Sequence, residues 1–458
     1  MINPGDDVAI LGLGVSGRAA ARYALWRGAT VRLSDSRPRE RFAIEEKELL
    51  AAPGVLWEAG GHTFDFLRMA GRILVSPGVD LAQPLLRRLE EAGVVISGEL
   101  AVAAEELSVP TVAITGTNGK TTTTTLVGEL LAAGGLDPFV GGNIGTPLYD
   151  YLRQPGDHRA VVAEVSSFQL ESAAAFAPRV GILLNITPDH LDRHGSMEAY
   201  GRIKMRLFAH QGAGDVAIVN GDDPLCRSLC QGLPGVLQTF GRGEDNTAVI
   251  AGKEVRVRVD GLVEEYSLAG TALGNSVGLQ NSAAAILAAR AMGVGREAIV
   301  GALRNFRLLP HRLELVNEID GVRYYNDSKA TNTGAVLGAL EEFDGNVLLI
   351  AGGRDKGDDY RLLRPAVAAS VRLLITIGEA AGLIEAALAD VVETVRAASL
   401  HEAVRLAASR AGRGDTVLLS PACASFDMFT SYGHRGSEFR KEVAALAAAV
   451  GTSAEGRR

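Results

Sequence analysis

Short apolar runs, each ending in glycine or a polar residue and followed by a helical stretch, recur along the whole chain. They cover residues 8–13, 73–75, 111–114, 160–165, 181–184, 216–219, 347–350, 373–377 and 416–419. Strands that are apolar throughout and alternate with helices are typical of parallel sheets that helices cover on both faces. The sequence therefore predicts an α/β fold built on parallel sheets.

The length of 458 residues predicts about three domains, at roughly 150 residues each. We place the boundaries near residues 98 and 305, which gives domains of residues 1–98, 99–305 and 306–458. Residues 247–268 depart from the pattern of apolar runs, because apolar and polar residues alternate there around Asp260-Gly261. This alternation predicts a β-hairpin.

Composition excludes several classes of protein. The net charge of −8 leaves no broad basic surface for nucleic acid. The three cysteines, Cys226, Cys230 and Cys423, are too few for a disulfide framework or a four-thiolate zinc site, and they indicate a reducing compartment. No apolar run reaches the roughly 20 residues of a membrane span, and no basic region followed by an apolar one opens the chain. We expect a cytoplasmic protein that does not insert into a membrane.

A glycine-rich loop at residues 116–121 (Gly-Thr-Asn-Gly-Lys-Thr) joins the apolar run 111–114 to a predicted helix over 122–131. Such a loop can turn its N–H groups toward phosphate oxygens, while Lys120 reaches the terminal phosphates and the Thr121 hydroxyl binds Mg²⁺. The loop is a shortened variant, since Ile114 stands where the usual pattern has its first glycine. A plain glycine-rich strand-to-helix turn is the alternative.

Two further strand ends carry candidate metal ligands. Glu164 lies in the run 160–165, and His190 ends the polar run that follows residues 181–184. Ligand groups in α/β sheets lie beyond the carboxyl ends of the strands. A carboxylate and an imidazole there can complete Mg²⁺ coordination beside a phosphate oxygen.

The first apolar run leads into the turn 12–17 (Gly-Leu-Gly-Val-Ser-Gly), and Asp35 ends the next strand. This pattern matches a dinucleotide-binding fingerprint, so an NAD-dependent oxidoreductase is a competing interpretation. The glycine turn itself indicates only that a diphosphate can bind, because any nucleotide diphosphate can dock on such a helix N-terminus. Ser36, Arg37 and Gly78 add groups at the same edge of the sheet.

The C-terminal third contains three polar loops at strand ends. They are residues 326–332 (Asn-Asp-Ser-Lys-Ala-Thr-Asn), 352–357 (Gly-Gly-Arg-Asp-Lys-Gly) and 420–427 (Ser-Pro-Ala-Cys-Ala-Ser-Phe-Asp). Asp327 can hold a ribose, and Lys329 and Arg312 can neutralise phosphate. Each loop alone is also compatible with an ordinary turn, but the three together favour an anion-binding face.

Over essentially its whole length the chain resembles the Mur ligase family. The most specific parts are the loops 116–121, 326–332 and 420–427, and in this family the shortened phosphate loop is the expected form. The resemblance implies an N-terminal Rossmann-like domain, a central P-loop ATPase-like domain and a C-terminal Rossmann-like domain. It implies ATP-dependent addition of D-glutamate to UDP-N-acetylmuramoyl-L-alanine through an acyl phosphate. This is a step of cytoplasmic peptidoglycan synthesis, on which cell shape and division depend.

The resemblance also assigns residues. For ATP it implies Gly116, Thr117, Asn118, Gly119, Lys120, Thr121, Thr122, Asn281, Arg312, Asp327 and Lys329. For the UDP-linked substrate it implies Gly14, Val15, Ser16, Ser36, Arg37, Gly78 and Asn143, and for D-glutamate Thr331, Lys356, Ser425 and Tyr432. Two Mg²⁺ ions are implied, with Thr121, Glu164, His190 and Lys204 as ligands and Lys120, His190 and Lys204 in catalysis. Lys204 is implied to be carbamylated, whereas its sequence neighbours alone are typical of an amphipathic helix with the lysine head in water.

Two positions depart from the family pattern, which has histidine at Gln280 and phenylalanine at Tyr432. Within the superfamily, another Mur ligase or a folylpolyglutamate synthase would share the ATP loop, but the latter is not expected to carry the 12–17 turn. A nucleotide-binding regulatory protein without catalysis is a further alternative. We expect a monomer whose partners are its small-molecule substrates.

Overall fold

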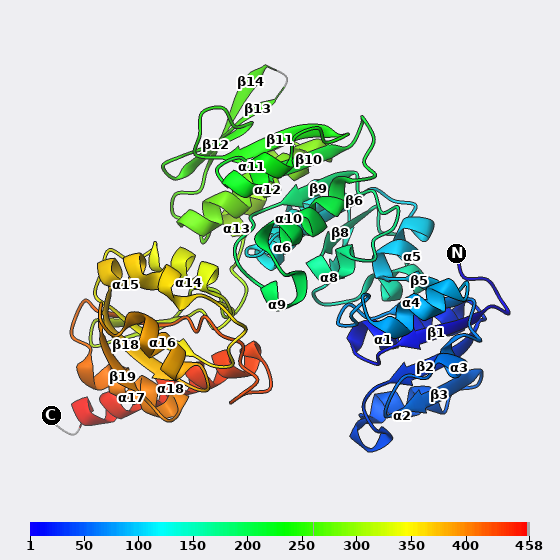
Figure 1. Cartoon of the computed structure of the whole chain (residues 1–458). Coiled ribbons are helices and arrows are strands. Elements are labelled where there is room, and N and C mark those ends of the chain that lie inside the picture. The colour runs from blue at the N-terminus through cyan, green and yellow to red at the C-terminus, as the bar shows by residue number, and fades with distance from the viewer. Residues whose placement is uncertain (260, 456–458) are drawn as a thin grey trace. The chain divides into compact units, whose positions relative to one another are not determined.

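The computed structural model describes residues 1–259 and 261–455, and these residues form three sheets with helices packed on them (Figure 1). The predicted α/β fold with three domains of mostly parallel strands is confirmed. By contacts within the chain, residues 1–186, 198–269 and 280–305 form one compact unit. Residues 187–197, 270–279 and 306–455 form a second unit.

The first sheet has five parallel strands in the order β3-β2-β1-β4-β5. Its strands are β1 (Asp7–Leu11), β2 (Thr30–Asp35), β3 (Val55–Ala59), β4 (Arg72–Val75) and β5 (Val95–Ser97). Its helices are α1 (Val15–Trp26), α2 (Ile44–Leu50), α3 (Phe64–Leu67) and α4 (Pro84–Glu91), with a 3-10 turn at Arg39–Arg41. Every strand ends at the same edge, so the turn after β1 and the loops after β2 and β4 meet there.

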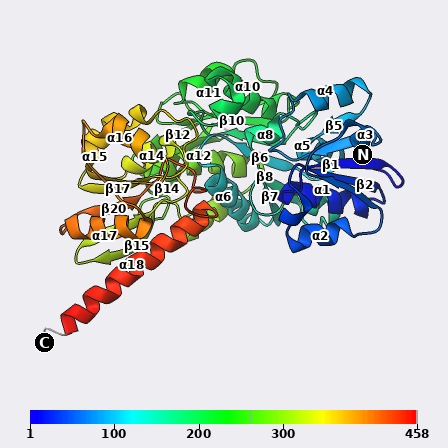
Figure 2. The same cartoon turned by 60° about the horizontal axis from the view of Figure 1, so that its bottom comes forward.

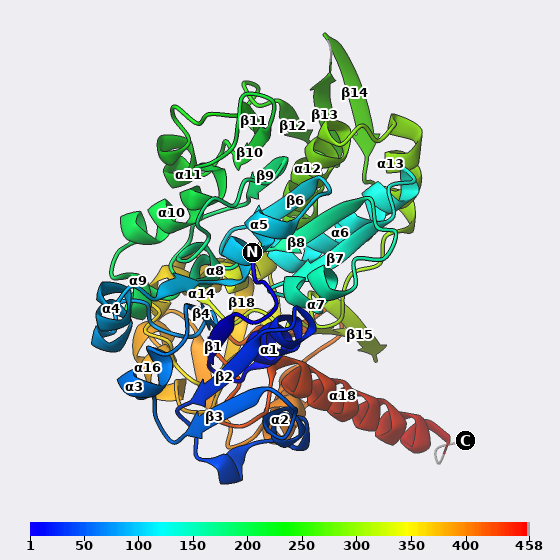
Figure 3. The ribbon, with the colours of Figure 1, turned by 90° about the vertical axis from the view of Figure 1, so that its right-hand side faces the viewer.

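The second sheet has nine strands in the order β14-β13-β12-β11-β10-β9-β6-β8-β7. They are β6 (Thr111–Thr115), β7 (Pro138–Gly142), β8 (Ala160–Glu164), β9 (Val180–Leu183), β10 (Val216–Asn220), β11 (Val236–Gly241), β12 (Ala248–Ala251), β13 (Glu254–Val259) and β14 (Leu262–Ser267). Strands β6 to β12 pair in parallel, whereas β13 pairs antiparallel with both β12 and β14. The predicted hairpin is therefore present at the sheet edge (Figure 3), although Asp260 of its turn lies outside the described residues.

Helices of several lengths accompany this sheet. They are α5 (Glu99–Glu106), α6 (Lys120–Ala133), α7 (Leu148–Arg153), α8 (Ser167–Leu170), α10 (Met197–Met205), α11 (Pro224–Leu229), α12 (Ser276–Ala291) and α13 (Arg296–Asn305), with a 3-10 turn at Arg206–Phe208. Helix α6 begins at Lys120, two residues before the predicted start, so the phosphate loop runs straight into the helix.

The third sheet has six strands in the order β15-β16-β20-β17-β18-β19, and only β15 is antiparallel to its neighbour. They are β15 (Glu314–Ile319), β16 (Val322–Asn326), β17 (Val347–Gly352), β18 (Val371–Ile377), β19 (Glu393–Arg396) and β20 (Thr416–Leu419). The same unit holds α9 (Leu191–His194), α14 (Thr333–Leu340), α15 (Arg364–Ser370), α16 (Ala381–Leu388), α17 (Leu400–Arg410) and α18 (Tyr432–Glu455), with a 3-10 turn at Tyr360–Leu363. Figure 2 shows α18 as one long helix, the last of the described chain.

Strand β17 explains why the apolar runs predicted this architecture. Leu349 packs in one core together with Val336 of α14, whereas Leu348 and Ile350 pack in a second core that includes Leu400 of α17. Successive side chains of a strand point to opposite faces. Both faces of this strand are covered by helices, and it must therefore be apolar at every position.

Candidate active site

The phosphate loop after β6 is shaped by two glycines with positive φ, Gly116 and Gly119. A Cβ on Gly119 would lie 2.5 Å from Oδ1 of Asn281, so a larger residue fits neither the space nor the φ of +84°. The structure thus brings Asn281 of α12 against the predicted loop. The first intrahelical bond of α6 runs from Thr123 N–H to the Gly119 carbonyl. The preceding N–H groups open the helix, where anions bind.

Asn185, in the polar run after β9, holds the middle of this loop. Its Oδ1 accepts from the N–H groups of Thr117 and Asn118 at 3.2 and 2.8 Å, and its Nδ2 donates to the Asn118 carbonyl at 3.1 Å. Strands β9 and β6 are neighbours in the sheet, so the residue after one reaches the loop after the other. The sequence analysis missed this role, although Asn185 stands in the run that it selected for His190.

Two lysines converge on one backbone oxygen of the loop. Lys120 Nζ donates to the carbonyls of Gly116 at 2.9 Å and Thr117 at 2.7 Å, and Lys204 Nζ donates to the same Gly116 carbonyl at 2.9 Å. Lys204 is only 1% exposed, and its ammonium lies 4.3 Å above the ring of Tyr200. The alternative that this lysine is a surface residue with its head in water is therefore wrong.

Glu164 lies at the end of β8, paired in register with Ile114 of β6. Its Oε1 accepts from Nδ2 of Asn143 at 2.8 Å, so a predicted metal ligand and a predicted substrate contact are neighbours. Its Oε2 is buried and makes no hydrogen bond to any residue that the structure describes. A buried carboxylate oxygen without a partner is costly, and a bound cation would supply one.

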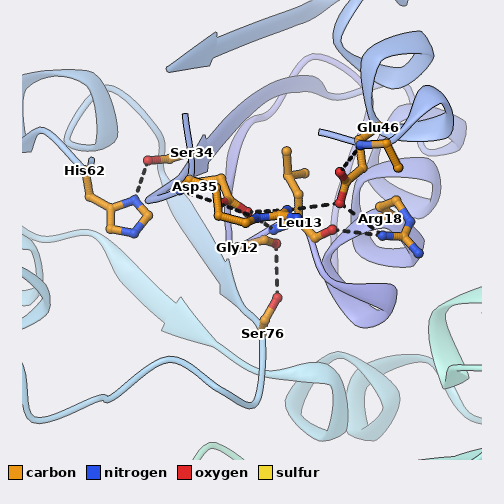
Figure 4. A network of polar contacts seen from close by, with 10 residues as sticks. Gly12, Leu13, Arg18, Ser34, Asp35, Glu46, His62 and Ser76 are labelled. Atoms are coloured by element: carbon orange, nitrogen blue, oxygen red, sulfur yellow. Dashed lines mark hydrogen bonds and ion pairs between the residues drawn. The ribbon is translucent and has the colours of Figure 1, made fainter. Parts of the chain in front are cut away.

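The turn after β1 is held by groups at the ends of two neighbouring strands, β2 and β4 (Figure 4). A Cβ on Gly17 would lie 1.8 Å from the Gly12 carbonyl, so only glycine allows α1 to pack this close to the turn. Ser76, after β4, donates to that same carbonyl at 3.1 Å. Gly14 caps α1, and Val15 and Ser16 form its first turn. Ser36, Arg37 and Gly78 lie in the loops after β2 and β4, at the same edge of the sheet.

Asp35 uses both carboxylate oxygens within this network (Figure 4). Oδ2 accepts from Leu13 N–H at 2.8 Å and from Arg37 Nη2 at 2.9 Å, and Oδ1 accepts from the N–H and Nε of Arg37. Burial acts to raise the pKa of Asp35, but the bonds from Arg37 and Leu13 outweigh it and hold the pKa below its usual value. The carboxylate organises the turn, which argues against its taking the ribose hydroxyl of NAD.

In the second unit, Asp327 follows β16 and is buried. Its Oδ1 accepts from Leu313 N–H at 3.2 Å, and its Oδ2 accepts from the Ser420 hydroxyl at 2.9 Å. Burial raises the pKa of Asp327 to about 7, against the lowering effects of Ser420, Leu313 and the charge of Arg312. Two predicted nucleotide residues, Asp327 and Arg312, are thus close enough to interact.

Lys329 is positioned by Tyr432. Its Nζ donates to the Tyr432 hydroxyl at 2.9 Å and lies 4.3 Å from the ring centre. The hydroxyl that distinguishes Tyr432 from the phenylalanine of the family pattern therefore has a partner here.

Arg435 of α18 joins two of the predicted loops. It is 1% exposed, and its guanidinium donates to the hydroxyl and carbonyl of Ser328 and to the carbonyls of Cys423 and Ala424. Ser425 is buried directly after these carbonyls, and Thr331 lies three residues beyond Ser328. The sequence analysis missed Arg435, because nothing in the pattern of α18 indicates a buried guanidinium.

Lys356, in the loop after β17, pairs with Asp189. Lys356 Nζ lies 2.7 Å from Asp189 Oδ1, and Asn332 Nδ2 donates to Asp189 Oδ2 at 3.1 Å. Burial acts to raise the pKa of Asp189, but the charges of Lys356 and His190 and these hydrogen bonds lower it below its usual value. His190 follows in the left-handed conformation, with Nε2 3.8 Å from Asp189 Oδ2.

The predicted residues divide between the two units. The first unit holds Gly14, Val15, Ser16, Ser36, Arg37, Gly78, the loop 116–122, Asn143, Glu164, Lys204 and Asn281. The second holds His190, Arg312, Asp327, Lys329, Thr331, Lys356, Ser425 and Tyr432. Most of these residues lie at the carboxyl ends of strands, in the loops that follow them or in the first turns of the next helices. Asn281, Lys204 and Tyr432 lie on other helices, and Arg312 lies in the segment between α13 and β15. Among residues 1–259 and 261–455, no helix is long and apolar enough to cross a membrane.

Three protein-family domains match the chain in order. The MurD-like N-terminal domain of Mur ligases matches residues 6–98, and the Mur ligase middle domain matches residues 114–289. The glutamate ligase domain of Mur ligases matches residues 311–423.

Two relatives match nearly the whole chain. A protein of Desulfotalea psychrophila named UDP-N-acetylmuramoylalanine–D-glutamate ligase is 53% identical over 439 residues, which are 96% of each chain. A protein of the same name from Pelotomaculum thermopropionicum is 44% identical over 444 residues, 96% of this chain and 97% of its own.

Solved structures share the fold at low identity. A pseudomurein peptide ligase type C from Methanothermus fervidus has a TM-score of 0.63 at 18% identity and covers 96% of this chain and 100% of its own. The MurF ligase of Thermotoga maritima, in complex with ADP, has a TM-score of 0.62 at 18% identity, with 97% and 96% covered.

Proposed function

The chain belongs to the Mur ligase family, and we propose that it catalyses the ATP-dependent addition of D-glutamate to UDP-N-acetylmuramoyl-L-alanine. The observation that carries the proposal is the 53% identity to a ligase of that name over 96% of both chains. The phosphate loop, with Lys120 and Lys204 on one carbonyl, supplies the chemistry that such a ligase needs. The reaction belongs to cytoplasmic synthesis of peptidoglycan precursors.

The proposed reaction activates a carboxylate that is otherwise a poor acyl donor, because its leaving group would be an oxide. The terminal phosphoryl group of ATP moves to the alanine carboxylate, breaking its bond to the oxygen of ADP and forming an acyl phosphate. The neutral amine of D-glutamate attacks this carbonyl, its nitrogen releases one proton, and the tetrahedral intermediate expels phosphate. Catalysis of such a transfer is mostly positioning and charge neutralisation. Lys120 lies on the loop where the terminal phosphates would be held.

Mg²⁺ fits the first unit, since Oε2 of Glu164 is buried without a hydrogen bond to any described residue. We propose Glu164 and the Thr121 hydroxyl as its ligands. When bound, the ion would neutralise charge on the phosphate oxygens during transfer. Lys120 and Asn143 would then position the phosphates and the alanine carboxylate around it.

For a second ion we propose a carbamate on Lys204, with His190 as a further ligand. The neutral Lys204 amine attacks CO₂, a nitrogen–carbon bond forms, and one proton is released. The product is an anionic oxygen ligand of the type that Mg²⁺ prefers. Two observations support the proposal: Lys204 is buried, and its amine shares an acceptor with the Lys120 ammonium. Replacing one of two neighbouring cations by an anion relieves their repulsion.

The other assignments remain proposals with local support. The turn 12–17, with Ser36, Arg37 and Gly78 at one sheet edge, is proposed to hold the UDP moiety, and Asn143 the muramoyl part. Asn281, Arg312, Asp327 and Lys329 are proposed for ATP, and Thr331, Lys356, Ser425 and Tyr432 for D-glutamate. Because one chain supplies every proposed residue, we propose that the enzyme acts as a monomer.

Phosphate release from ATP tests the proposal. Release should require both UDP-N-acetylmuramoyl-L-alanine and D-glutamate, and neither L-glutamate nor diaminopimelate should replace the latter. Dependence on another amino acid would identify a different Mur-type ligase, and dependence on a folate substrate a folylpolyglutamate-type enzyme. Phosphate release without either substrate, or NAD reduction in their place, would reject the proposed ligase.

A further inference from the structure

Residues 187–197 follow β9 of the second sheet in sequence, yet they pack within the unit of the third sheet. There the carboxylate of Asp189, which is 7% exposed, lies between two loops of that sheet. Lys356 comes from the loop after β17, and Asn332 comes from the loop before α14. This segment therefore brings an acidic side chain to the lysine proposed for D-glutamate.

The orientation of Asp189 is fixed by a helix cap. Asn332 caps α14, with its Oδ1 accepting from Ala335 N–H at 2.9 Å. Its Nδ2 donates to Asp189 Oδ2 at 3.1 Å. The cap thus sets the position of Asn332, and Asn332 sets the position of the carboxylate.

Among the residues that the structure describes, the Lys356 ammonium donates a hydrogen bond to Asp189, at 2.7 Å. Asp358 stands on the same loop, but its Oδ2 accepts from Thr333 N–H at 3.0 Å at the start of α14. An ammonium has three donors on a flexible stem. One donor is used by Asp189, and the Lys356 side chain stays 23% exposed.

We infer that Asp189 is a positioning residue, which holds the Lys356 ammonium so that its remaining donors meet the side-chain carboxylate of D-glutamate. This inference rests on the proposed function. A lysine without this anchor samples many rotamers, and the incoming carboxylate must then order it at a cost in affinity. Loss of Asp189 therefore weakens D-glutamate binding and does not change the rate of the chemical steps that follow binding.

Asp189→Asn tests the inference, because it removes the charge and keeps the shape. We expect the KM for D-glutamate to rise about tenfold, as for loss of one charge-assisted hydrogen bond. The kcat at saturating D-glutamate, and the KM values for ATP and the UDP-linked substrate, should stay within about twofold. Lys356→Ala should raise the KM for D-glutamate further, and adding Asp189→Asn to it should change nothing more.

Asp415→Asn is the matched control. Asp415 is a buried carboxylate of the same unit, paired with Arg372 at 2.7 Å, and it lies outside these loops. This change should lower the thermal unfolding temperature without altering the KM for D-glutamate. Asn332→Ser keeps a capping hydroxyl but removes the amide that holds Asp189, so it is a milder second variant if Asp189→Asn does not fold. Asn332→Ser should raise the KM for D-glutamate about threefold.

A KM for D-glutamate that stays constant in Asp189→Asn, or effects that add in the double variant, would overturn the inference. A lower KM would also overturn it, since Asp189 would then be a competitor of the substrate carboxylate. If the unmodified enzyme releases no phosphate in response to D-glutamate, the proposed function fails, and the inference fails with it. If the unmodified enzyme is active and only the variants disagree, the role of Asp189 alone is rejected.

Discussion

The ammonium groups of Lys120 and Lys204 both donate to the carbonyl oxygen of Gly116, each at 2.9 Å. Their segments are far apart in sequence, since one opens α6 and the other lies near the end of α10. Two cations beside one acceptor repel each other. The arrangement is therefore suited either to a ligand that carries several negative charges or to a chemical change in one of the lysines.

Lys120→Ala should lower phosphate release by about a thousandfold, because a charge that stabilises phosphoryl transfer is lost. The thermal unfolding temperature should change little, since the side chain is half-buried at the first residue of α6. Lys253→Ala, in the exposed turn between β12 and β13, is the control and should remain fully active. Near-normal phosphate release by Lys120→Ala would mean that this loop does not hold the triphosphate.

Lys204 should carry a carbamate in the active enzyme. Activity should fall in buffer depleted of CO₂ and return when bicarbonate is added. Lys204→Ala and Lys204→Arg should both lose about a hundredfold or more of the activity, because neither side chain can supply an anionic oxygen to Mg²⁺. Neither variant should respond to bicarbonate, whereas Lys253→Ala should respond as the unmodified enzyme does. An unmodified Lys204 in a crystal structure of the substrate-bound, active enzyme would contradict this prediction.

The apolar runs predicted fully buried central strands such as β17, and they missed edge strands such as β3, β15 and β19. β17 is apolar at each of its positions because both of its faces are buried. β3 and β19 lie at sheet edges and expose several side chains, so neither has a continuous apolar run. β15 is an antiparallel edge strand of the same kind. An edge strand is specified by its neighbour more than by its own composition.

The site residues divide in a similar way. The phosphate loop and the 12–17 turn were predictable, because glycine and lysine at fixed spacing are a local signal. Arg435 lies 107 residues from Ser328, and Asp189 lies 167 residues from Lys356. Such contacts depend on how distant segments pack, and no local pattern encodes them. The burial of Lys204 was unpredictable for the same reason.

Asp327 should make stability depend on pH. Burial raises its pKa to about 7 in the folded chain, above its ordinary value of 3.8, so the folded state retains a proton that the unfolded state has lost. The stabilising contribution is complete at low pH and is lost as the pH rises through about 7. As the pH rises from 5 to 8, the free energy of unfolding of Asp327→Asn should therefore increase by about 2–3 kcal/mol relative to that of the unmodified protein. Urea unfolding of the second unit at both pH values measures this.

Equal effects of Asp327→Asn at pH 5 and pH 8 would show that the Asp327 carboxyl is ionised throughout. Asp390→Asn is the comparison, because Asp390 is an exposed carboxylate of the same unit, and its hydrogen bond and ion pair with Arg364 hold its pKa below the usual value. The change that Asp390→Asn causes in the free energy of unfolding should not grow between pH 5 and pH 8.

Asp35→Asn should weaken binding of the UDP-linked substrate alone. The carboxylate accepts from Leu13 N–H and from three donors of Arg37, whereas an amide has one oxygen and turns an N–H group toward one of these donors. The turn 12–17 then loses its anchor, and the KM for the UDP-linked substrate should rise about tenfold or more. The KM values for ATP and D-glutamate should stay within about twofold.

Asp7→Asn is the matched control, since Asp7 makes a bidentate pair with Arg32 in the same sheet but at the start of β1, away from the turn. It should leave all three KM values unchanged. An equal rise of all three in Asp35→Asn would indicate general destabilisation, and an unchanged KM for the UDP-linked substrate would remove the turn from the proposed binding site.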